Sequence, residues 1–520
     1  NYSCGPDSFN LHFFSYQMEA KPFAVIETDG HSGDAGTKTR VEAFLHTVHE
    51  DLTVQTHKTP NCLKAIEDDR RTMPEIMAKK DRVLIPRMGQ GAPVLAAALR
   101  GAGVPAEALP MPKRSTLDAG RRHTSGKECV PMTITLGSLL ERLDLEKDPE
   151  ETFAFFMPTA NGPCRFGVYN IMHKIVLERL GYKDRVRVWS PADSGYFEGT
   201  PGGLVVLIFS VFAGADMLQH ALLTTRPIET VKGAADAIHD RYYDELTTLA
   251  ETVGAGDIST PTALLNVANG RLFGVNNLLR RAAAEFAAIK SDKAVPTVSV
   301  VGEIYVRCDP FANDFIVTQL EERGIRAFFA PFTEWLEYTD YLNLQENKAI
   351  GDQFSSLIQR RIQARTYNIF ADKLGWPERT SVNASLEAAA PYIRKELTGE
   401  AVLTVGGPVH EWRHGIIDGV VSVGPLECMP NKIAEAQFFH VAEQEGLLSL
   451  TLSINGDPVD PEVLDNFAFE IHSRFRNKQA NETTQDEATS NVPFFRRVTT
   501  PNAPFLRRVA RRLGPNTPRA

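Results

Sequence analysis

The sequence predicts an α/β protein whose sheets are mostly parallel. Short apolar runs alternate with stretches of helical periodicity, and a loop containing glycine, proline or aspartate separates each run from the helix after it. A mostly helical stretch lies between two regions of this kind. Strands that alternate with helices usually pair in parallel, because each helix carries the chain back to the edge of the sheet where the strand began.

Four segments show this order of strand, loop and helix most clearly. We expect strands at 23–26, 82–86, 153–157 and 298–305, followed by helices at 39–48, at 93–100, at 165–180 and up to residue 322. Residues 203–290 have apolar residues at helical spacing, interrupted at Thr260-Pro261, and are predicted to form a helical insert.

The chain is therefore expected to have five regions. Residues 1–55 are the C-terminal piece of a preceding α/β lobe, 56–200 an α/β lobe with Cys129 and Cys164, 201–295 the helical insert, 296–475 a second α/β lobe with Cys428, and 476–520 a disordered basic tail. The tail is rich in Asn, Gln, Thr and Glu, and then in proline and arginine, a composition typical of disorder. The chain starts with Asn1, and Cys4 falls at once in a motif, so we expect further sequence upstream.

An internal repeat links the two ends of the chain. Cys4-Gly-Pro-Asp and Cys428-Met-Pro-Asn each precede a helical pattern with a Phe-Phe pair, then a strand, a turn with aspartate and glycine, and another helix. Repeated order at similar spacing indicates related structural units. We expect each copy to bring one thiolate to a comparable place.

Composition narrows the class of protein. A formal net charge of −9 argues against the whole chain binding nucleic acid, which calls for a basic face. The longest apolar run, 204–213, has about half the length that a membrane helix needs. Six cysteines without a close pair favour the reducing cytoplasm over a disulfide-bonded protein.

The cysteines share a local pattern. Cys4, Cys129 and Cys428 each have a proline two residues later and precede an amphipathic run, and Cys164 lies in Gly-Pro-Cys-Arg-Phe-Gly between a strand and a helix. Proline suits the first turn of a helix, so each cysteine is expected near a helix start, where free amides and the dipole favour a thiolate. Thiolates in such places serve metal clusters well, because backbone N–H groups hydrogen-bond their sulfurs.

The spacing of these cysteines does not decide between metal and structural roles. Gaps of 125, 35 and 264 residues separate them in sequence and match no local zinc or iron–sulfur pattern. Buried or helix-capping cysteines without metal remain an open alternative. Cys62 lies in a polar stretch and is treated as incidental, while the role of Cys308, at a strand end, stays open.

Two cations near the cysteines and two histidines elsewhere in the chain are further candidate site residues. Lys127 and Arg165 lie next to the proposed ligands and are candidates for offsetting cluster charge or holding an anionic substrate group; a surface role is the alternative. His410 and His414 do not form the HExxH motif, and the nearby glycines and Pro408 predict that no stable helix forms there. We therefore expect no zinc site at these histidines.

Several longer motifs stand out in the sequence. They are Ser-Gly-Lys-Glu-Cys-Val-Pro at 125–131, Phe-Met-Pro-Thr at 156–159, Gly-Pro-Cys-Arg-Phe-Gly at 162–167, Gly-Glu-Ile-Tyr-Val-Arg at 302–307, Asp-Pro-Phe-Ala-Asn-Asp at 309–314 and Gly-Pro-Leu-Glu-Cys-Met-Pro-Asn-Lys at 424–432. These motifs resemble the 2-hydroxyacyl-CoA dehydratase D-component (benzoyl-CoA reductase-type) family, and in particular its long activator-fused members. The resemblance covers roughly residues 2–475.

The resemblance implies a two-lobed subunit with Rossmann-like sheets and one low-potential iron–sulfur cluster, a [4Fe-4S] cluster, held by three cysteines. It implies Cys129, Cys164 and Cys428 as one set of ligands and Cys4 as the last ligand of a preceding lobe. It also implies an ATP-dependent activator that supplies electrons singly, for dehydration or reduction of a small substrate such as a CoA thioester. These 520 residues contain no GxxxxGK[ST] loop, so the activator is expected upstream in the same polypeptide or on another chain.

Three hypotheses follow from the sequence. The first is a cytoplasmic iron–sulfur enzyme component of the dehydratase or reductase type. The second is an electron-relay component that turns over no substrate. The third is a metal-free α/β scaffold.

Overall fold

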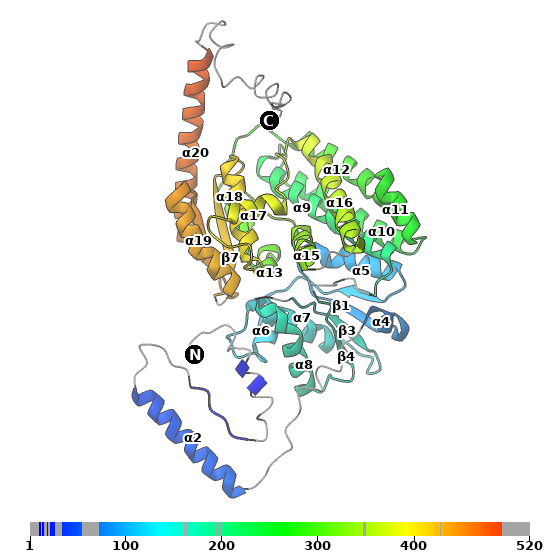
Figure 1. Cartoon of the computed structure of the whole chain (residues 1–520), viewed down its shortest axis with the longest axis vertical. Helices are drawn as coiled ribbons and strands as arrows, with labels where there is room; N and C mark the ends of the chain where they lie inside the picture. The colour runs from blue at the N-terminus through cyan, green and yellow to red at the C-terminus, as the bar shows by residue number, and fades with distance from the viewer. Residues whose placement is uncertain are drawn as a thin grey trace, which may run out of the picture. The chain divides into compact units, whose positions relative to one another are not determined.

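The computed structural model has an α/β fold with two four-stranded sheets, and every strand pair in both sheets is parallel (Figure 1). The predicted fold class is confirmed at this level. The residues that the structure describes are 10–11, 13–14, 18, 21–26, 34–54, 72–160, 162, 164–192, 196, 199–346, 350–426 and 428–490. The chain divides into two compact units, Asn1–Leu464 and Asp465–Ala520.

The first sheet has the strand order β2-β1-β3-β4. Its strands are β1 (Arg82–Ile85), β2 (Ala106–Ala108), β3 (Phe153–Phe156) and β4 (Val186–Trp189), and its helices are α4 (Met73–Lys79), α5 (Gly91–Gly101), α6 (Arg114–Arg121), α7 (Val130–Asp144), the 3-10 turn η1 (Arg165–Val168) and α8 (Tyr169–Arg179). Val83, Leu84, Phe153 and Phe155 are completely buried. Helices on both faces of a parallel sheet exclude water, which explains why these strands read as continuous apolar runs.

The second sheet repeats that order as β6-β5-β7-β8. Its strands are β5 (Thr297–Gly302), β6 (Arg326–Phe329), β7 (Gly419–Gly424) and β8 (Ser449–Ser453), and its helices are α13 (Ile304–Cys308), α14 (Ile316–Glu322), α15 (Phe332–Glu346), α16 (Ile350–Leu374), α17 (Val382–Ala389), α18 (Ala401–Arg413) and α19 (Met429–Glu445). Cys164 and Cys428 therefore occupy equivalent places, each after the third strand of its sheet. Ligands of such sheets bind at the carboxyl ends of the strands.

Helices occupy the stretch between the two sheets, as predicted. They are α9 (Gly202–Thr225), η2 (Arg226–Ile228), α10 (Ala234–Gly254), α11 (Thr260–Asn269), η3 (Leu272–Gly274) and α12 (Val275–Ile289). They group with α5 and α16 around one apolar core (Figure 1). The segment Gly202–Ile228 has the length and apolarity to cross a membrane, but 78% of its most apolar window is buried inside the protein. Such burial is typical of a helix in the core of a protein.

A close helix crossing positions α7, the helix that Cys129 begins. A Cβ atom added to Gly137 would lie 1.9 Å from the Thr116 carbonyl oxygen on α6, and one added to Gly120 would lie 1.9 Å from the Thr133 carbonyl oxygen on α7. Only glycine allows the two backbones to approach this closely. The crossing therefore determines where the start of α7 lies.

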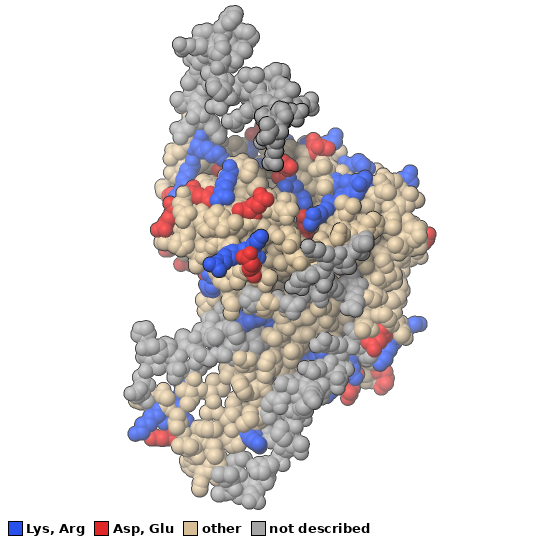
Figure 2. All heavy atoms as spheres, in the orientation of Figure 1, with Lys and Arg blue, Asp and Glu red and all other residues tan. Residues whose placement is uncertain are grey.

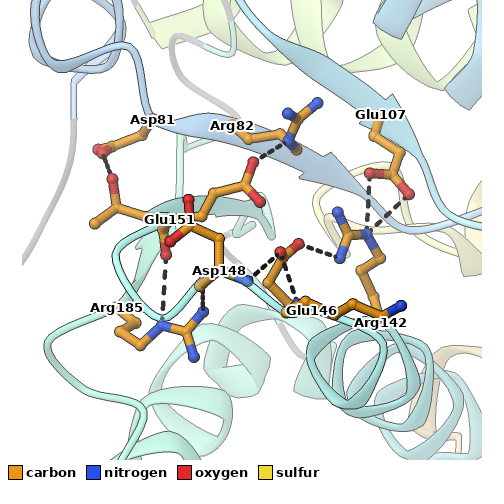
Figure 3. Close-up of polar contacts among 10 residues, drawn as sticks. Asp81, Arg82, Glu107, Arg142, Glu146, Asp148, Glu151 and Arg185 are labelled. Atoms are coloured by element: carbon orange, nitrogen blue, oxygen red, sulfur yellow. Dashed lines mark hydrogen bonds and ion pairs between the residues drawn. The ribbon is translucent and has the colours of Figure 1, made fainter.

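Ion pairs secure the other end of α7 (Figure 3). Arg142 donates from Nε to both carboxylate oxygens of Glu107 on β2, at 3.0 Å each, and from Nη1 to Glu146 at 2.9 Å. A backbone N–H bond from Asp148, followed by the Arg142 bond, lowers the pKa of Glu146 to about 2. Arg82 pairs with Glu151 at the start of β1. This network lies at the amino ends of the strands, opposite the edge where the cysteines lie.

Some predictions about secondary structure are wrong. Residues 22–26 are not paired with any other strand in the described part of the chain, so the predicted strand at 23–26 has no sheet to join. The His410 region is helical, because α18 runs through Gly406, Gly407 and Pro408. Gly406 lies against the Ser385 carbonyl of α17, where an added Cβ would be 2.0 Å away, so tight packing outweighs the weak helix preference of glycine.

The C-terminal region also differs from its prediction. Helix α20 (Pro461–Ser490) covers the first part of the predicted disordered tail, residues 476–490, which contain neither glycine nor proline to end a helix. Residues 491–520 lie outside the described residues. On the face drawn in Figure 2, Lys and Arg side chains are interspersed with Asp and Glu, and no large area carries a single sign.

Candidate metal centre

Three of the four candidate ligands lie at the predicted places. Cys129 precedes α7, Cys164 precedes η1, and Cys428 precedes α19; each is the N-cap residue of its helix, with extended or near-extended backbone angles. The prediction that each of these cysteines begins a helix is confirmed, although the helix at Cys164 starts as a 3-10 turn. Cys129 and Cys428 are buried and Cys164 is partly buried. Cys4 and Cys62 lie outside the described residues.

Polar groups near the three sulfurs favour negative charge on them. The backbone N–H groups of Phe166 and Asn431 lower the pKa of Cys164 and of Cys428 against the larger effect of burial, although neither cysteine side chain accepts a capping hydrogen bond. The Tyr169 hydroxyl, from the first turn of α8, donates to the Cys129 sulfur. Such donors stabilise negative charge on sulfur and tune the potential of a bound cluster.

The three sulfurs lie within electrostatic reach of one another. Burial raises the pKa of the Cys164 thiol, and the nearby Cys129 raises it further. Burial raises the pKa of the Cys428 thiol as well, with added contributions from Glu303, Cys129 and Cys164. These residues are separated by 35 and 264 positions in sequence, so folding brings distant segments to one place.

Glu303 is a site residue to which the sequence analysis gave no role. It follows β5 directly, caps α13, and accepts a hydrogen bond from the Val306 backbone N–H at 2.8 Å. Its negative charge raises the pKa of all three thiols and of Tyr169. Burial in turn raises the pKa of the Glu303 carboxyl. An acidic residue at the carboxyl end of a buried strand was the available signal.

Arg165 supplies a positive charge beside the sulfurs. Its side chain is 7% exposed, it donates from Nη1 to the Lys127 carbonyl at 2.9 Å, and its charge lowers the pKa of Cys129 against the larger effect of burial. Lys127 lines a cavity of about 160 Å³ together with Glu128, Val130, Leu426 and Asn455. This cavity therefore adjoins the residues next to both Cys129 and Cys428.

A second group of buried charges extends from this site into the second sheet. Arg307 is 2% exposed, and its Nη1 lies 3.9 Å from Oε1 of Glu400, which is 8% exposed. Burial raises the pKa of Glu400 well above its usual range, against the opposing charge of Arg307. Cys308 belongs to this group, because the positive charge of Arg307 lowers its pKa against the larger effect of burial. Burial raises the pKa of Cys308 to about 12.

The three cysteines do not form a site for a single metal ion. Among the described residues, no three His, Cys, Asp or Glu side chains lie close enough together to hold one metal ion. In a four-iron cluster each thiolate binds a different iron, so its ligands stand further apart than those of a zinc ion. Cys129, Cys164 and Cys428 lie near enough for their charges to influence one another's pKa, and Arg165 places a positive charge beside Cys129.

No protein-family model matches the chain, and no curated protein matches it.

Proposed function

We propose that this chain is an iron–sulfur protein of the 2-hydroxyacyl-CoA dehydratase type, with two lobes and Rossmann-like sheets. The observation that carries the proposal is the mutual electrostatic influence of Cys129, Cys164 and Cys428, which come from distant parts of the chain. Two further observations support it: each cysteine lies at the start of a helix, and the surrounding motifs resemble those of the family.

In this proposal Cys129, Cys164 and Cys428 would hold a [4Fe-4S] cluster through their thiolates. Such a cluster would supply single low-potential electrons for reduction or dehydration of a substrate. The protein contributes the Tyr169 hydroxyl as a donor to Cys129, the nearby N–H groups of Phe166 and Asn431, and a neighbouring positive charge from Arg165.

The cavity beside Lys127 is the proposed place for part of a substrate. It is lined by polar and apolar residues, including Arg121 and Lys127, whose side chains carry positive charge. Cations there favour an anionic substrate group, such as a phosphate or carboxylate of an acyl-CoA-like molecule. At about 160 Å³ the cavity holds a small group and not an entire CoA thioester.

The proposal includes an ATP-dependent activator as partner, encoded upstream in the same polypeptide or on another chain, and a cytoplasmic location. Cys4 is proposed as a ligand contributed to a preceding lobe. An electron-relay role without substrate turnover remains the alternative within the same class of protein.

A metal-free scaffold is the competing function, and one observation favours it. Burial raises the pKa of all three thiols, so without a metal they are neutral and compatible with a closed apolar core. Cys129 in fact packs in the core beneath the first sheet, with Met132, Phe155 and Met157.

Anaerobic reconstitution with iron and sulfide tests the cluster directly. We expect a broad visible absorption band and bound iron in the parent protein, and loss of both in each of Cys129→Ser, Cys164→Ser and Cys428→Ser. Cys308→Ser is the matched control, since Cys308 is buried but belongs to the Arg307 group. Iron retained by all three variants, or lost equally in the control, would contradict the assignment.

Turnover separates the enzyme from the relay. The reconstituted protein is reduced with dithionite, or with an activator and ATP, and is offered a panel of 2-hydroxyacyl-CoA thioesters. Product formation that depends on Cys129, Cys164 and Cys428 supports the enzyme. Reduction and reoxidation of the cluster without any product supports the relay.

A further inference from the structure

A second cavity lies along β6, the edge strand of the second sheet, and is enclosed by α9, α16 and the segment 375–380. Its volume is about 200 Å³. Its walls include His220, Arg326, Phe328, Gln363, Trp376 and Glu411. None of the three candidate cluster ligands lines it.

Three buried polar atoms on the walls of this cavity have no hydrogen-bond partner in the described part of the chain. They are Nε of Arg326, Oε1 of Gln363 and Oε2 of Glu411. Gln363 is 4% exposed, and its Nε2 is already used, donating to the Thr333 carbonyl at 2.9 Å. Buried polar groups are costly to leave unpaired, so three such atoms around one cavity indicate that the cavity suits a polar occupant.

Aromatic rings form the apolar part of the wall. His220 packs edge-on against Phe328 at 5.1 Å and against Trp376 at 4.5 Å between ring centroids. Burial lowers the pKa of His220 to about 4, so the imidazole is neutral and adds no positive charge. Tyr367 lies 5.4 Å from Trp376 and completes this wall. The arrangement favours a flat ring as occupant.

The charges in the cavity favour an anion at Arg326. Arg379 is paired with Glu337 at 2.9 Å, and Lys290 donates to the Leu374 carbonyl. Arg326 also has a charged neighbour, Asp418, but its buried Nε has no hydrogen-bond partner among the described residues. Burial raises the pKa of Glu411, an acid in the same wall, to about 8, which weakens its repulsion of an anion near neutral pH.

The size of the cavity limits the ligand to one ring. An apolar cavity of about 150 Å³ accepts benzene, and drug-sized ligands occupy roughly 300–1,000 Å³. A space of about 200 Å³ accommodates a benzene ring with small substituents and excludes a nucleotide or an entire CoA thioester.

We propose that this cavity binds a small aromatic carboxylic acid that also carries a hydrogen-bond donor. The carboxylate pairs with Arg326, the ring packs against Phe328 and Trp376, and the donor reaches Gln363 Oε1. This binding site does not depend on the cluster proposed above.

Titration of the full chain with 4-hydroxybenzoate tests the site. Trp376 lies in the wall, so ligand should change tryptophan fluorescence saturably, and calorimetry should give one site per chain. In Arg326→Met we expect binding weaker by at least about tenfold, or about 1.4 kcal/mol. Arg280→Met, an exposed arginine on α12, is the matched control and should bind as the parent does.

Ligand comparisons on the unaltered protein test the same site without risk of misfolding. Phenol, which lacks the carboxylate, and inorganic phosphate, which lacks the ring, should each bind at least about tenfold more weakly than 4-hydroxybenzoate. Benzoate should bind more weakly too, because it leaves Gln363 unpaired. Absence of saturable binding, phenol or phosphate binding as tightly as 4-hydroxybenzoate, or equal binding by the Arg326 and Arg280 variants would overturn the proposal.

Discussion

Substitution of Gly137 by alanine tests how the crossing of α6 and α7 positions Cys129. The new methyl group would lie 1.9 Å from the Thr116 carbonyl oxygen, whereas ordinary van der Waals contact begins near 3.4 Å. The helices must therefore separate by about 1.5 Å, the difference between those two distances. Because α7 begins directly after Cys129, this movement displaces its sulfur relative to Cys164.

The expected change in stability comes from two opposing terms. Overpacking against backbone costs about 3 kcal/mol, at the upper end of the usual range. Alanine gains about 1 kcal/mol over glycine within a helix. The net loss of about 2 kcal/mol should lower the melting temperature by roughly 2 °C, because the unfolding entropy of the compact unit Asn1–Leu464 is large, and the iron content after reconstitution should be smaller.

Thermal unfolding followed by far-UV circular dichroism measures this difference. Gly36→Ala is the matched control, since Gly36 also lies in a helix, α2 (Asp34–Val54), and an added methyl group there meets no atom within 4 Å. The control should melt at or slightly above the temperature of the parent protein. If Gly137→Ala melts together with Gly36→Ala, the close crossing does not hold α7 in place.

Three further predictions concern a buried acid, an aromatic core residue and a sulfur donor. Burial raises the folded-state pKa of Glu411 from 4.5 to about 8, so the stability that its protonated form contributes is complete below the unfolded value and is lost as pH rises towards the folded value. Glu411→Gln should therefore be more stable than the parent by about 3 kcal/mol near pH 7 and nearly equal to it near pH 4; a difference independent of pH in urea unfolding would contradict this. Phe286→Ala should cost about 3–5 kcal/mol in urea unfolding, because Phe286 is completely buried, whereas the exposed Phe439→Ala should change stability by less than about 0.5 kcal/mol. Tyr169→Phe removes the hydroxyl donor to the Cys129 sulfur, so a reconstituted cluster should be retained with a lower reduction potential; an unchanged potential in a redox titration would remove Tyr169 from the site.

Strong local signals made part of the fold predictable. Apolar runs marked β1, β3 and β5 to within a few residues, because buried parallel strands need apolar side chains on both faces. The strand expected after the helix at Cys428 in the internal repeat is β8, in which serine and threonine alternate with leucine. The other four strands, β2, β4, β6 and β7, were not predicted from the sequence. Two of these, β2 and β4, are short and interrupted by charged residues, as in Ala-Glu-Ala and Val-Arg-Val-Trp, so they resemble loops until a neighbouring strand pairs with them.

The candidate metal centre and the cavity at Arg326 also differ in how much of each the local sequence predicts. Cysteine followed two residues later by proline predicted a helix start at Cys129 and Cys428, because the missing N–H of proline is tolerated only in the first turn. Glu303 received no role, since its influence on the sulfurs arises from elements far apart in sequence. No local sequence pattern predicts the cavity at Arg326, because its walls come from β6, α9, α16 and α18, which are far apart in sequence.

The sequence by itself determined the α/β class, the helical stretch between the two sheets and the helix starts at the cysteines, because these depend on neighbours within a few residues along the chain. Only the tertiary structure decided the strand order, the convergence of Cys129, Cys164 and Cys428, and the unpaired polar groups around the second cavity. Those features depend on which distant surfaces pack together, and the glycine crossing of α6 and α7 shows that a single methyl group is enough to change such packing.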